Sequence, residues 1–226
     1  MHTLTAQDTG IDNVNGWNTM PVICEHASVI ARRAQHKVKV IARIHTSTND
    51  LQQLGVYNNV TDIVKKMSIL YPNIDICIEN TAKTISQPLT NVDIIRDVKQ
   101  KNVGSCLDVC NALMATQQTR LLSSMGIKFM PYEAFFKRMM DSIKFIHLSN
   151  AIDDGMGYGI GSGHDYQFDI EDEESLEKLE RTMWLYKDHE YDCDVCITTD
   201  IDNIDYFFNT YEAIKSVCSR LNIPVQ

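Results

Sequence analysis

Four of five short apolar segments end at, or next to, a residue that can bind a metal ion or move a proton. The segments span residues 38–44, 74–78, 103–107, 143–148 and 193–197, and the first four carry His45, Glu79, Asp108 and His147 at their ends. The fifth segment runs into Thr198, Thr199 and Asp200. Two imidazoles and two carboxylates suit a borderline divalent cation such as zinc or manganese. The pattern therefore predicts a shared polar centre that holds a metal ion.

These segments must be strands if their ends are to meet. Each has the length of a strand, and most are rich in β-branched residues. Helical periodicity fills the intervals, at about 19–36, 59–71, 90–101, 110–124, 132–141, 172–187 and 203–221. Strands that are apolar on both faces and alternate with helices predict an α/β fold with a parallel sheet, either doubly wound or closed as a (β/α) barrel. No linker interrupts the alternation, so a single domain over residues 1–226 is expected.

The polar strand ends favour the barrel, because reactive groups of (β/α) barrels gather at the carboxyl ends of several strands. A structural interpretation stands beside this one. A barrel needs polar groups at its mouth, and Glu79 or Asp108 could simply bond to nearby backbone. The four positions taken together favour a functional centre.

Composition excludes several classes of protein. The 226 residues include 44% hydrophobic and 23% charged residues, typical of a globular protein. No apolar run is long enough to span a bilayer and no signal peptide begins the chain, so no membrane contact and a cytoplasmic location are expected. The net charge of -9 makes nucleic acid an unlikely but not excluded partner. The seven cysteines lack a disulfide spacing and are expected to be reduced.

Three motifs resemble the xylose-isomerase-like TIM barrel superfamily, which includes sugar phosphate isomerases and epimerases and the type IV apurinic/apyrimidinic (AP) endonucleases. They are Glu79-Asn80-Thr81-Ala82, the stretch Cys106-Leu107-Asp108-Val109-Cys110-Asn111, and His147-Leu148-Ser149-Asn150 followed by a glycine-rich segment. The resemblance covers the chain from about residue 38 onward. It implies a metal-dependent enzyme built on a (β/α) TIM-type barrel.

The resemblance also implies roles for single residues. Glu79 corresponds to a catalytic carboxylate that also binds metal, Asp108 and His147 to further metal ligands, and His45 to a histidine of the preceding strand. His2 would stand one strand earlier still. Asn80 and Asn111 are assigned to substrate binding.

Departures from the family pattern weaken the assignment of an activity. Members that cleave DNA carry a histidine where this chain has Asn111, and another in the loop where it has Asp153-Asp154-Gly155. Isomerases and endonucleases alike place a glutamate where this chain has Thr198, whose hydroxyl is a weak ligand and no base at neutral pH. Asp200 is the candidate to replace that glutamate as a catalytic group.

The N-terminal part is short for the family. If His2 ends a strand, about six β/α units remain, and a barrel that stops early exposes strand edges. A homo-oligomer that closes the barrel is therefore expected, unless the first residues are arranged differently from the family.

Glycines alternate with other residues through residues 155–163. Their spacing is not that of a dinucleotide-binding loop, and the expected role is an active-site loop whose backbone approaches a phosphate. Gly159, Gly161 and His164 are the substrate-binding candidates of this segment, with a purely structural turn as the alternative.

Three functions remain open. The leading hypothesis is a metal-dependent isomerase or epimerase acting on a small sugar or sugar phosphate. The first alternative is a DNA phosphodiesterase resembling the type IV AP endonucleases. The second is a degenerate barrel without catalysis that serves binding or assembly, which Thr198 and Asn111 favour.

Overall fold

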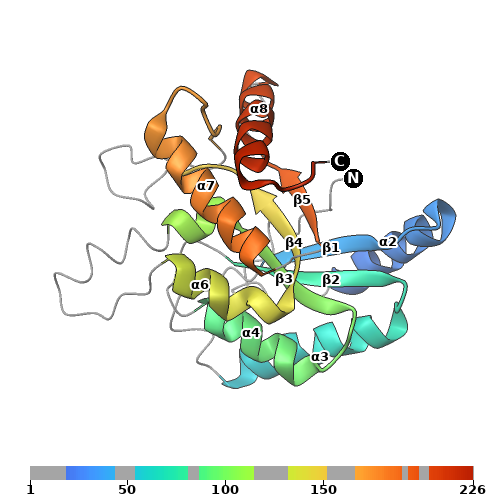
Figure 1. The fold of residues 1–226 in the computed structure, drawn as a ribbon. Helices are drawn as coiled ribbons and strands as arrows, with labels where there is room; N and C mark the ends of the chain where they lie inside the picture. The colour runs from blue at the N-terminus through green and yellow to red at the C-terminus, as the bar shows by residue number, and fades with distance from the viewer. Residues whose placement is uncertain are drawn as a thin grey trace. The chain divides into compact units, whose positions relative to one another are not determined.

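The computed structural model describes residues 19–43, 54–80, 87–114, 132–151, 166–189, 193–198 and 204–225. These residues form five strands that follow one another through the sheet in the order β1-β2-β3-β4-β5 (Figure 1). The chain divides into two compact units. Unit 1 comprises residues 1–106 with 141–144, and unit 2 comprises 107–140 with 145–226. Whether the chain is a single domain, as the sequence predicts, stays a prediction.

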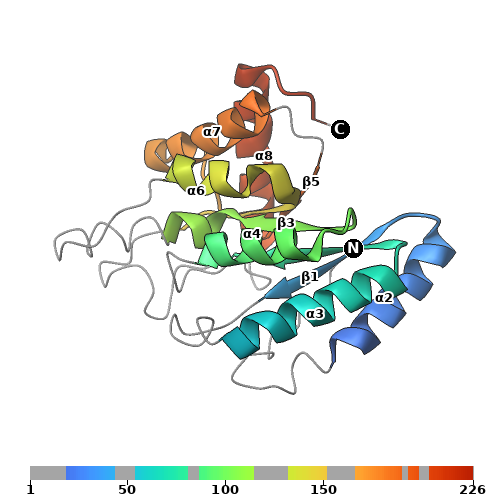
Figure 2. The ribbon, with the colours of Figure 1, turned by 90° about the horizontal axis from the view of Figure 1, so that it is seen from below.

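Unit 1 begins with helix α2 (Met20–Ala34), followed by β1 (Val38–Arg43), α3 (Leu54–Leu70), β2 (Ile74–Glu79) and α4 (Gln87–Val98). It also contains most of β3 (Val103–Asp108). Strand β1 pairs in parallel with β2, and β2 with β3. Figure 2 shows α2 and α3 lying side by side next to β1.

Alternation along the strands of unit 1 decides which side chains meet the helices. Val40, Ile76 and Ile78 belong to the hydrophobic core that α2, α3 and α4 cover. Successive strand residues project to opposite faces. Ile41, Cys77 and Glu79 therefore project to the other face of the sheet, and all three are buried.

Unit 2 contains the carboxyl end of β3 and a helical stretch over 109–114. Helix α6 (Tyr132–Met139), a short 3-10 helix, η1 (Met140–Ser142), and β4 (Ile143–Leu148) follow, and the unit is completed by α7 (Glu173–Asp188), β5 (Asp194–Ile197) and α8 (Ile204–Leu221). Four residues of this stretch, Asp141–Lys144, belong to unit 1: they are the last two residues of η1 and the first two of β4. Strand β5 pairs in parallel with β4. Along α8, Thr210, Ala213, Ile214, Val217 and Cys218 are buried, at the spacing of one helix face.

Strands predicted from the sequence agree closely with the observed ones. Each of the five lies within one or two residues of its expected range. Phe135, Phe136 and Met139 pack inside from α6, as an amphipathic helix on a sheet requires. The predicted helix over 110–124 is helical through residue 114, and its remainder lies outside the described residues.

Acidic residues 171–174 are exposed at the start of α7. Asp172 is the N-cap of α7, and its side chain accepts a hydrogen bond from the backbone N–H of Glu174 at 3.1 Å. Glu173 and Glu174 occupy the first turn, where negative charge offsets the partial positive charge of the helix end.

None of the seven cysteines, all of which lie among the described residues, forms a disulfide bond. Five of them are buried, and Cys193 and Cys196 are partly exposed. In the part of the chain that the structure describes, no helix combines the length and apolar character needed to cross a membrane.

Candidate functional site

Glu79 ends β2 with a fully buried carboxylate. Its exposed fraction is 0%, and its register partner on β3 is Cys106, which is also 0% exposed. Register partners on parallel strands project their side chains to the same face of the sheet. Unit 1 thus presents a carboxylate and a thiol side by side at the carboxyl end of two neighbouring strands.

Two buried asparagines, Asn80 and Asn91, lie at the end of β2. Asn80 follows Glu79 and is also fully buried. The side-chain amide of Asn91, on α4, donates a hydrogen bond to the backbone carbonyl of Glu79 at 3.1 Å. This bond ties the backbone of Glu79 to α4. Within the described residues, the buried Oδ1 atom of Asn91 has no hydrogen-bond partner.

Asp108 ends β3 and caps the helical stretch that follows it. Its Oδ1 accepts a hydrogen bond from the backbone N–H of Asn111 at 2.7 Å. This is the N-cap bond to the third helical residue. Asp108 is 3% exposed and Asn111 5% exposed. Since the carboxylate also has a second oxygen, capping and metal ligation are compatible roles for Asp108.

Two substitutions of Asp108 separate these roles. Asp108→Asn keeps an N-cap acceptor but removes the charge, so the free energy of unfolding should change little while metal affinity falls. Asp108→Ala removes both, and should cost about 1 kcal/mol of stability in addition. Urea unfolding and metal titration of the apo proteins check both effects. Equal metal affinity in the wild type and Asp108→Asn would show that Asp108 is a helix cap and not a metal ligand.

His147 lies on β4 in unit 2, one residue before the strand ends. It is 4% exposed, and its ring contacts that of Phe145 edge-to-face at a centroid distance of 5.2 Å. Its register partner on β5 is Cys196. The imidazole is thus held in the sheet by packing rather than placed on a solvated loop.

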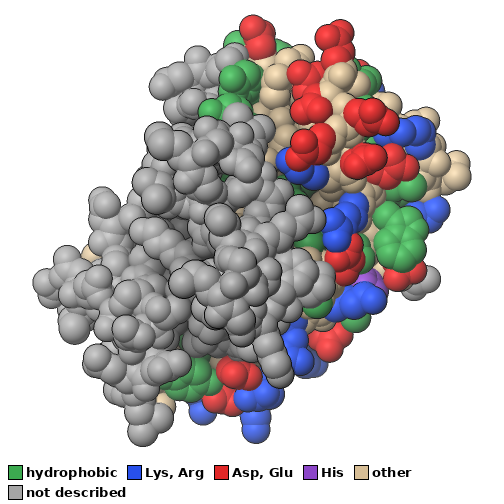
Figure 3. Space-filling view, turned by 90° about the vertical axis from the view of Figure 1, so that its left-hand side faces the viewer, with side chains coloured by type: hydrophobic (Ala, Val, Ile, Leu, Met, Phe, Trp, Pro, Cys, Tyr) green, Lys and Arg blue, Asp and Glu red, His purple; other side chains and the backbone are tan. Residues whose placement is uncertain are grey.

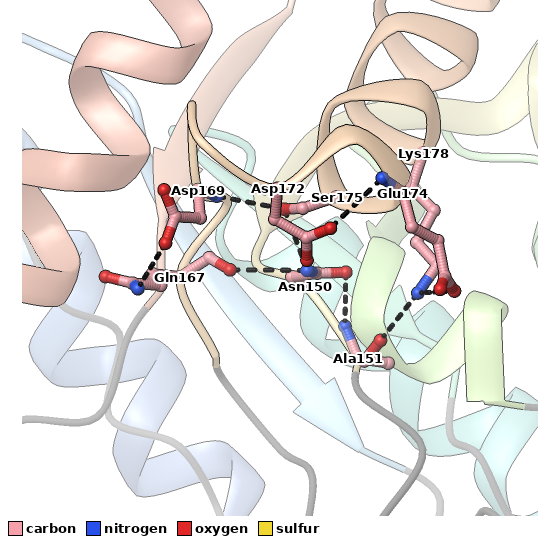
Figure 4. A network of polar contacts seen from close by, with 8 residues as sticks. All are labelled: Asn150, Ala151, Gln167, Asp169, Asp172, Glu174, Ser175 and Lys178. Carbon is pink, nitrogen blue, oxygen red and sulfur yellow. Dashed lines mark hydrogen bonds and ion pairs between the residues drawn. The ribbon is translucent and has the colours of Figure 1, made fainter.

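Asn150 fixes the chain just beyond β4 (Figure 4). It forms an antiparallel bridge with Tyr166 through hydrogen bonds of 2.9 and 3.2 Å. Its side-chain amide donates to the hydroxyl of Ser175 at 3.1 Å and to the carbonyl of Gln167 at 3.3 Å. Lys178 donates to the carbonyl of Ala151 at 3.2 Å and pairs with Glu174. Residues 150–151 and 166–167 are therefore joined to each other and to the start of α7.

Thr198 follows β5 at the position where the family places a glutamate. Its backbone N–H donates to the carbonyl of Leu148 at 3.1 Å, and its hydroxyl donates to that of Ser149 at 3.3 Å. In this chain the position therefore continues the contacts between β4 and β5.

Six predicted site residues fall outside the described ranges: His2, His45, Gly159, Gly161, His164 and Asp200. Their roles stay predictions. The five others, Glu79, Asn80, Asp108, Asn111 and His147, are all buried at or just beyond strand ends. The glycine-rich segment itself, 155–163, also lies outside the described residues.

Cys106 is the residue that sequence reasoning missed. A signal was present, since Cys106 lies two positions before Asp108 on the same strand and therefore projects to the same face. The sequence alone instead predicts a reduced thiol without a functional role, as for the other six cysteines. Only the register between β2 and β3 shows that it stands beside Glu79.

The donor types at these strand ends fit a divalent cation. Glu79, Cys106 and His147 are each buried and each offer a ligand atom that zinc accepts. A buried carboxylate is costly unless a cation, a proton or hydrogen-bond donors compensate it. The chemistry of the residues is thus compatible with the metal that the fold family implies.

Several solved structures have the same fold. A xylose isomerase domain protein from Planctomyces limnophilus superposes with a TM-score of 0.61 at 12% identity, over 92% of this chain and 66% of that one. A 3-keto-D-glucoside 4-epimerase from E. coli gives 0.58 at 12% identity, over 97% and 76%. D-Psicose 3-epimerase from Clostridium cellulolyticum H10, solved with D-tagatose, gives 0.52 at 11% identity, over 93% and 71%. The chain thus spans about two thirds to three quarters of the length of these proteins.

No protein-family model and no curated protein matches the sequence. The likeness therefore concerns the fold, at identities far below those at which activity is shared. Parallel strands in chain order, each followed by helical structure, correspond to part of such a barrel. The described residues thus have the α/β fold expected from the sequence, that of an incomplete (β/α) TIM-type barrel, and this fold is shared with the xylose isomerase domain protein.

Proposed function

We propose that this protein is a metal-dependent isomerase or epimerase that acts on a small sugar or sugar phosphate. The observation that carries the proposal is the fully buried carboxylate of Glu79 at the carboxyl end of β2. In this fold the carboxyl ends of the strands are where reactive groups gather. Asp108 is the last residue of β3, and His147 is the last but one of β4. These two strands follow β2 in the order of the sheet.

Glu79, Asp108 and His147 would hold the metal, with His45 and His2 as further candidate ligands. A bound zinc or manganese ion would polarise a carbonyl and a neighbouring hydroxyl of the sugar. The protein's own part is then to move a proton at the adjacent carbon. Glu79 is the candidate for that transfer, and Asp200 is the candidate for a second base in place of the absent glutamate at Thr198.

The substrate class comes from the structural neighbours. One of them is an epimerase solved with D-tagatose, and another is named as an epimerase of a keto-glucoside. A ketose of similar size is therefore the first substrate to test. Asn80 directly follows Glu79, and Asn111 lies three residues after Asp108. Both are buried and supply amides that can bind sugar hydroxyls. Gly159, Gly161 and His164 keep their proposed role in substrate binding.

Solvent deuterium exchange tests the proposal without knowledge of the product. The protein loaded with zinc or manganese is incubated in D2O with a panel of ketoses and their phosphates, and each sugar is followed by proton NMR. Proton transfer at the carbon beside the carbonyl incorporates deuterium there, whichever epimer forms. Exchange in the wild type and none in Glu79→Gln is expected. No exchange with any sugar under either metal would contradict the proposal.

The two alternatives receive unequal support. Figure 3 shows acidic side chains gathered on one region of the described surface. At and around the start of α7, five acidic residues are exposed: Glu171, Asp172, Glu173, Glu174 and Glu177. Such a region repels a phosphate backbone, which counts against cleavage of abasic DNA. Thr198 favours the non-catalytic barrel, since its hydroxyl contacts Ser149. Together with the leading function, we propose that the protein is cytoplasmic.

We further propose that two copies of the chain associate through β5 and α8. Among the described strands β5 pairs with β4 alone, and its Val195 is 38% exposed. Ile204 and Phe208 of α8 are 66% and 57% exposed. An open strand edge beside apolar side chains is prone to self-pairing, and a second copy offers the same edge.

Light scattering after gel filtration checks this association. The wild type should have about twice the monomer mass of 25.8 kDa, and Phe208→Glu should shift it toward the monomer. Ile30→Glu on α2, where the wild-type side chain is 40% exposed, serves as the matched control and should leave the mass unchanged. A monomeric wild type at micromolar concentration would exclude the dimer.

A further inference from the structure

We propose that Cys106 is a metal ligand and that its thiolate selects zinc over manganese. This inference rests on the proposed function, because it concerns the same metal. The resemblance to sugar isomerases does not assign Cys106 as a ligand. The sequence left zinc and manganese open, and this inference chooses zinc.

The register of the sheet places Cys106 beside Glu79. The two are Cα partners in the parallel pairing of β2 and β3, so both side chains leave the sheet on the same face. Both are 0% exposed. Asp108, two residues further along β3, projects to that face as well. Cys106 therefore lies in line with two of the carboxylates proposed to bind the metal.

Ligand softness then distinguishes the metals. Thiolate ligands favour zinc, whereas carboxylate, carbonyl and water ligands suit manganese and magnesium. On metal binding the S–H bond of Cys106 breaks, the sulfur bonds the cation, and the proton leaves to solvent. A site with Glu79 and His147 alone would accept either metal, but the addition of Cys106 shifts the preference to zinc.

Cys77 provides a matched control within the same sheet. It lies two residues before Glu79 on β2, projects to the same face and is also 0% exposed. Its register partner is Gly104, which offers no ligand, and it lies further from the strand end. A Cys77→Ser substitution therefore introduces the same chemical change without removing the proposed ligand.

Cobalt substitution gives a direct signature. The apo protein is titrated with Co2+, and a thiolate ligand produces a sulfur-to-cobalt charge-transfer band in the near ultraviolet. The band is expected in the wild type and in Cys77→Ser and absent in Cys106→Ser. Competition between Zn2+ and Mn2+ should show a zinc preference that falls by at least ~10-fold in Cys106→Ser.

The outcomes separate this inference from the proposed function. Cobalt bound without the band in the wild type would overturn ligation by Cys106 and leave the metal site standing. No cobalt bound would overturn both. Should Cys106→Ser fail to fold, X-ray absorption at the zinc edge of the wild type still decides, since one sulfur at about 2.3 Å is expected. A shell of nitrogen and oxygen alone would refute the ligation.

Discussion

Glu79→Gln is expected to lower sugar turnover by about 10³-fold and to leave the fold intact. The amide has nearly the shape of the carboxylate, so packing at the end of β2 is preserved. It carries no negative charge for a cation and accepts no proton at neutral pH. Because Glu79 is 0% exposed, water cannot readily take over either role.

Asp75→Asn is the matched control for this substitution. Asp75 lies four residues earlier on the same face of β2, at the other end of the strand, and forms a 3.0 Å ion pair with the exposed Lys37. The same carboxylate-to-amide change there should alter turnover by less than about twofold, because Asp75 lies at the opposite end of β2 from the proposed site. Rates and circular dichroism of both variants are compared. Full activity in Glu79→Gln would show that Glu79 has no catalytic role.

The largest expected effect on stability is that of Asn102→Ala, at about 3 kcal/mol. The side-chain amide nitrogen of Asn102 donates to three backbone carbonyls, those of Ser68, Tyr71 and Ile74, at 3.0, 3.3 and 3.1 Å. Its backbone carbonyl in turn accepts from the N–H of Ile76 at 2.8 Å. This one residue joins the end of α3, the start of β2 and the entry to β3. Alanine would leave three largely buried carbonyls without that donor.

Urea unfolding measures this loss. Asn59→Ala, at an exposed position on α3, is the control and should change the free energy of unfolding by less than about 0.5 kcal/mol. A similar small change in Asn102→Ala would show that water replaces the lost amide.

The strands and the residues at their ends could be predicted because they follow from local pattern. Short apolar runs that carry Glu79, Asp108 and His147 at or next to their ends are visible in the sequence, and the structure places each of these residues at or next to a strand end. Alternation with helices was sufficient to predict a parallel α/β fold. These features depend on residue type and on spacing along the chain alone.

Features that depend on pairing between segments could not be predicted. The position of Cys106 beside Glu79 could not be predicted, because the sequence does not give the register between β2 and β3. The hydrogen bonds of Asn102 and Asn150 could not be predicted either. Asn102 donates to three backbone carbonyls, and Asn150 joins its own segment to Gln167 and to the start of α7. Asp108 was expected to be a ligand, and its additional role as a helix cap required the geometry of the turn.

The central claim is that the strand ends hold a divalent metal, and metal content tests it most directly. The protein is purified without chelator and analysed by elemental mass spectrometry, together with His147→Ala and Glu79→Gln. About one equivalent of zinc in the wild type, lost in both variants while their circular dichroism is unchanged, is the predicted result. A folded wild-type protein with no metal above background, and none taken up from added zinc, would contradict the claim and favour a barrel without catalysis.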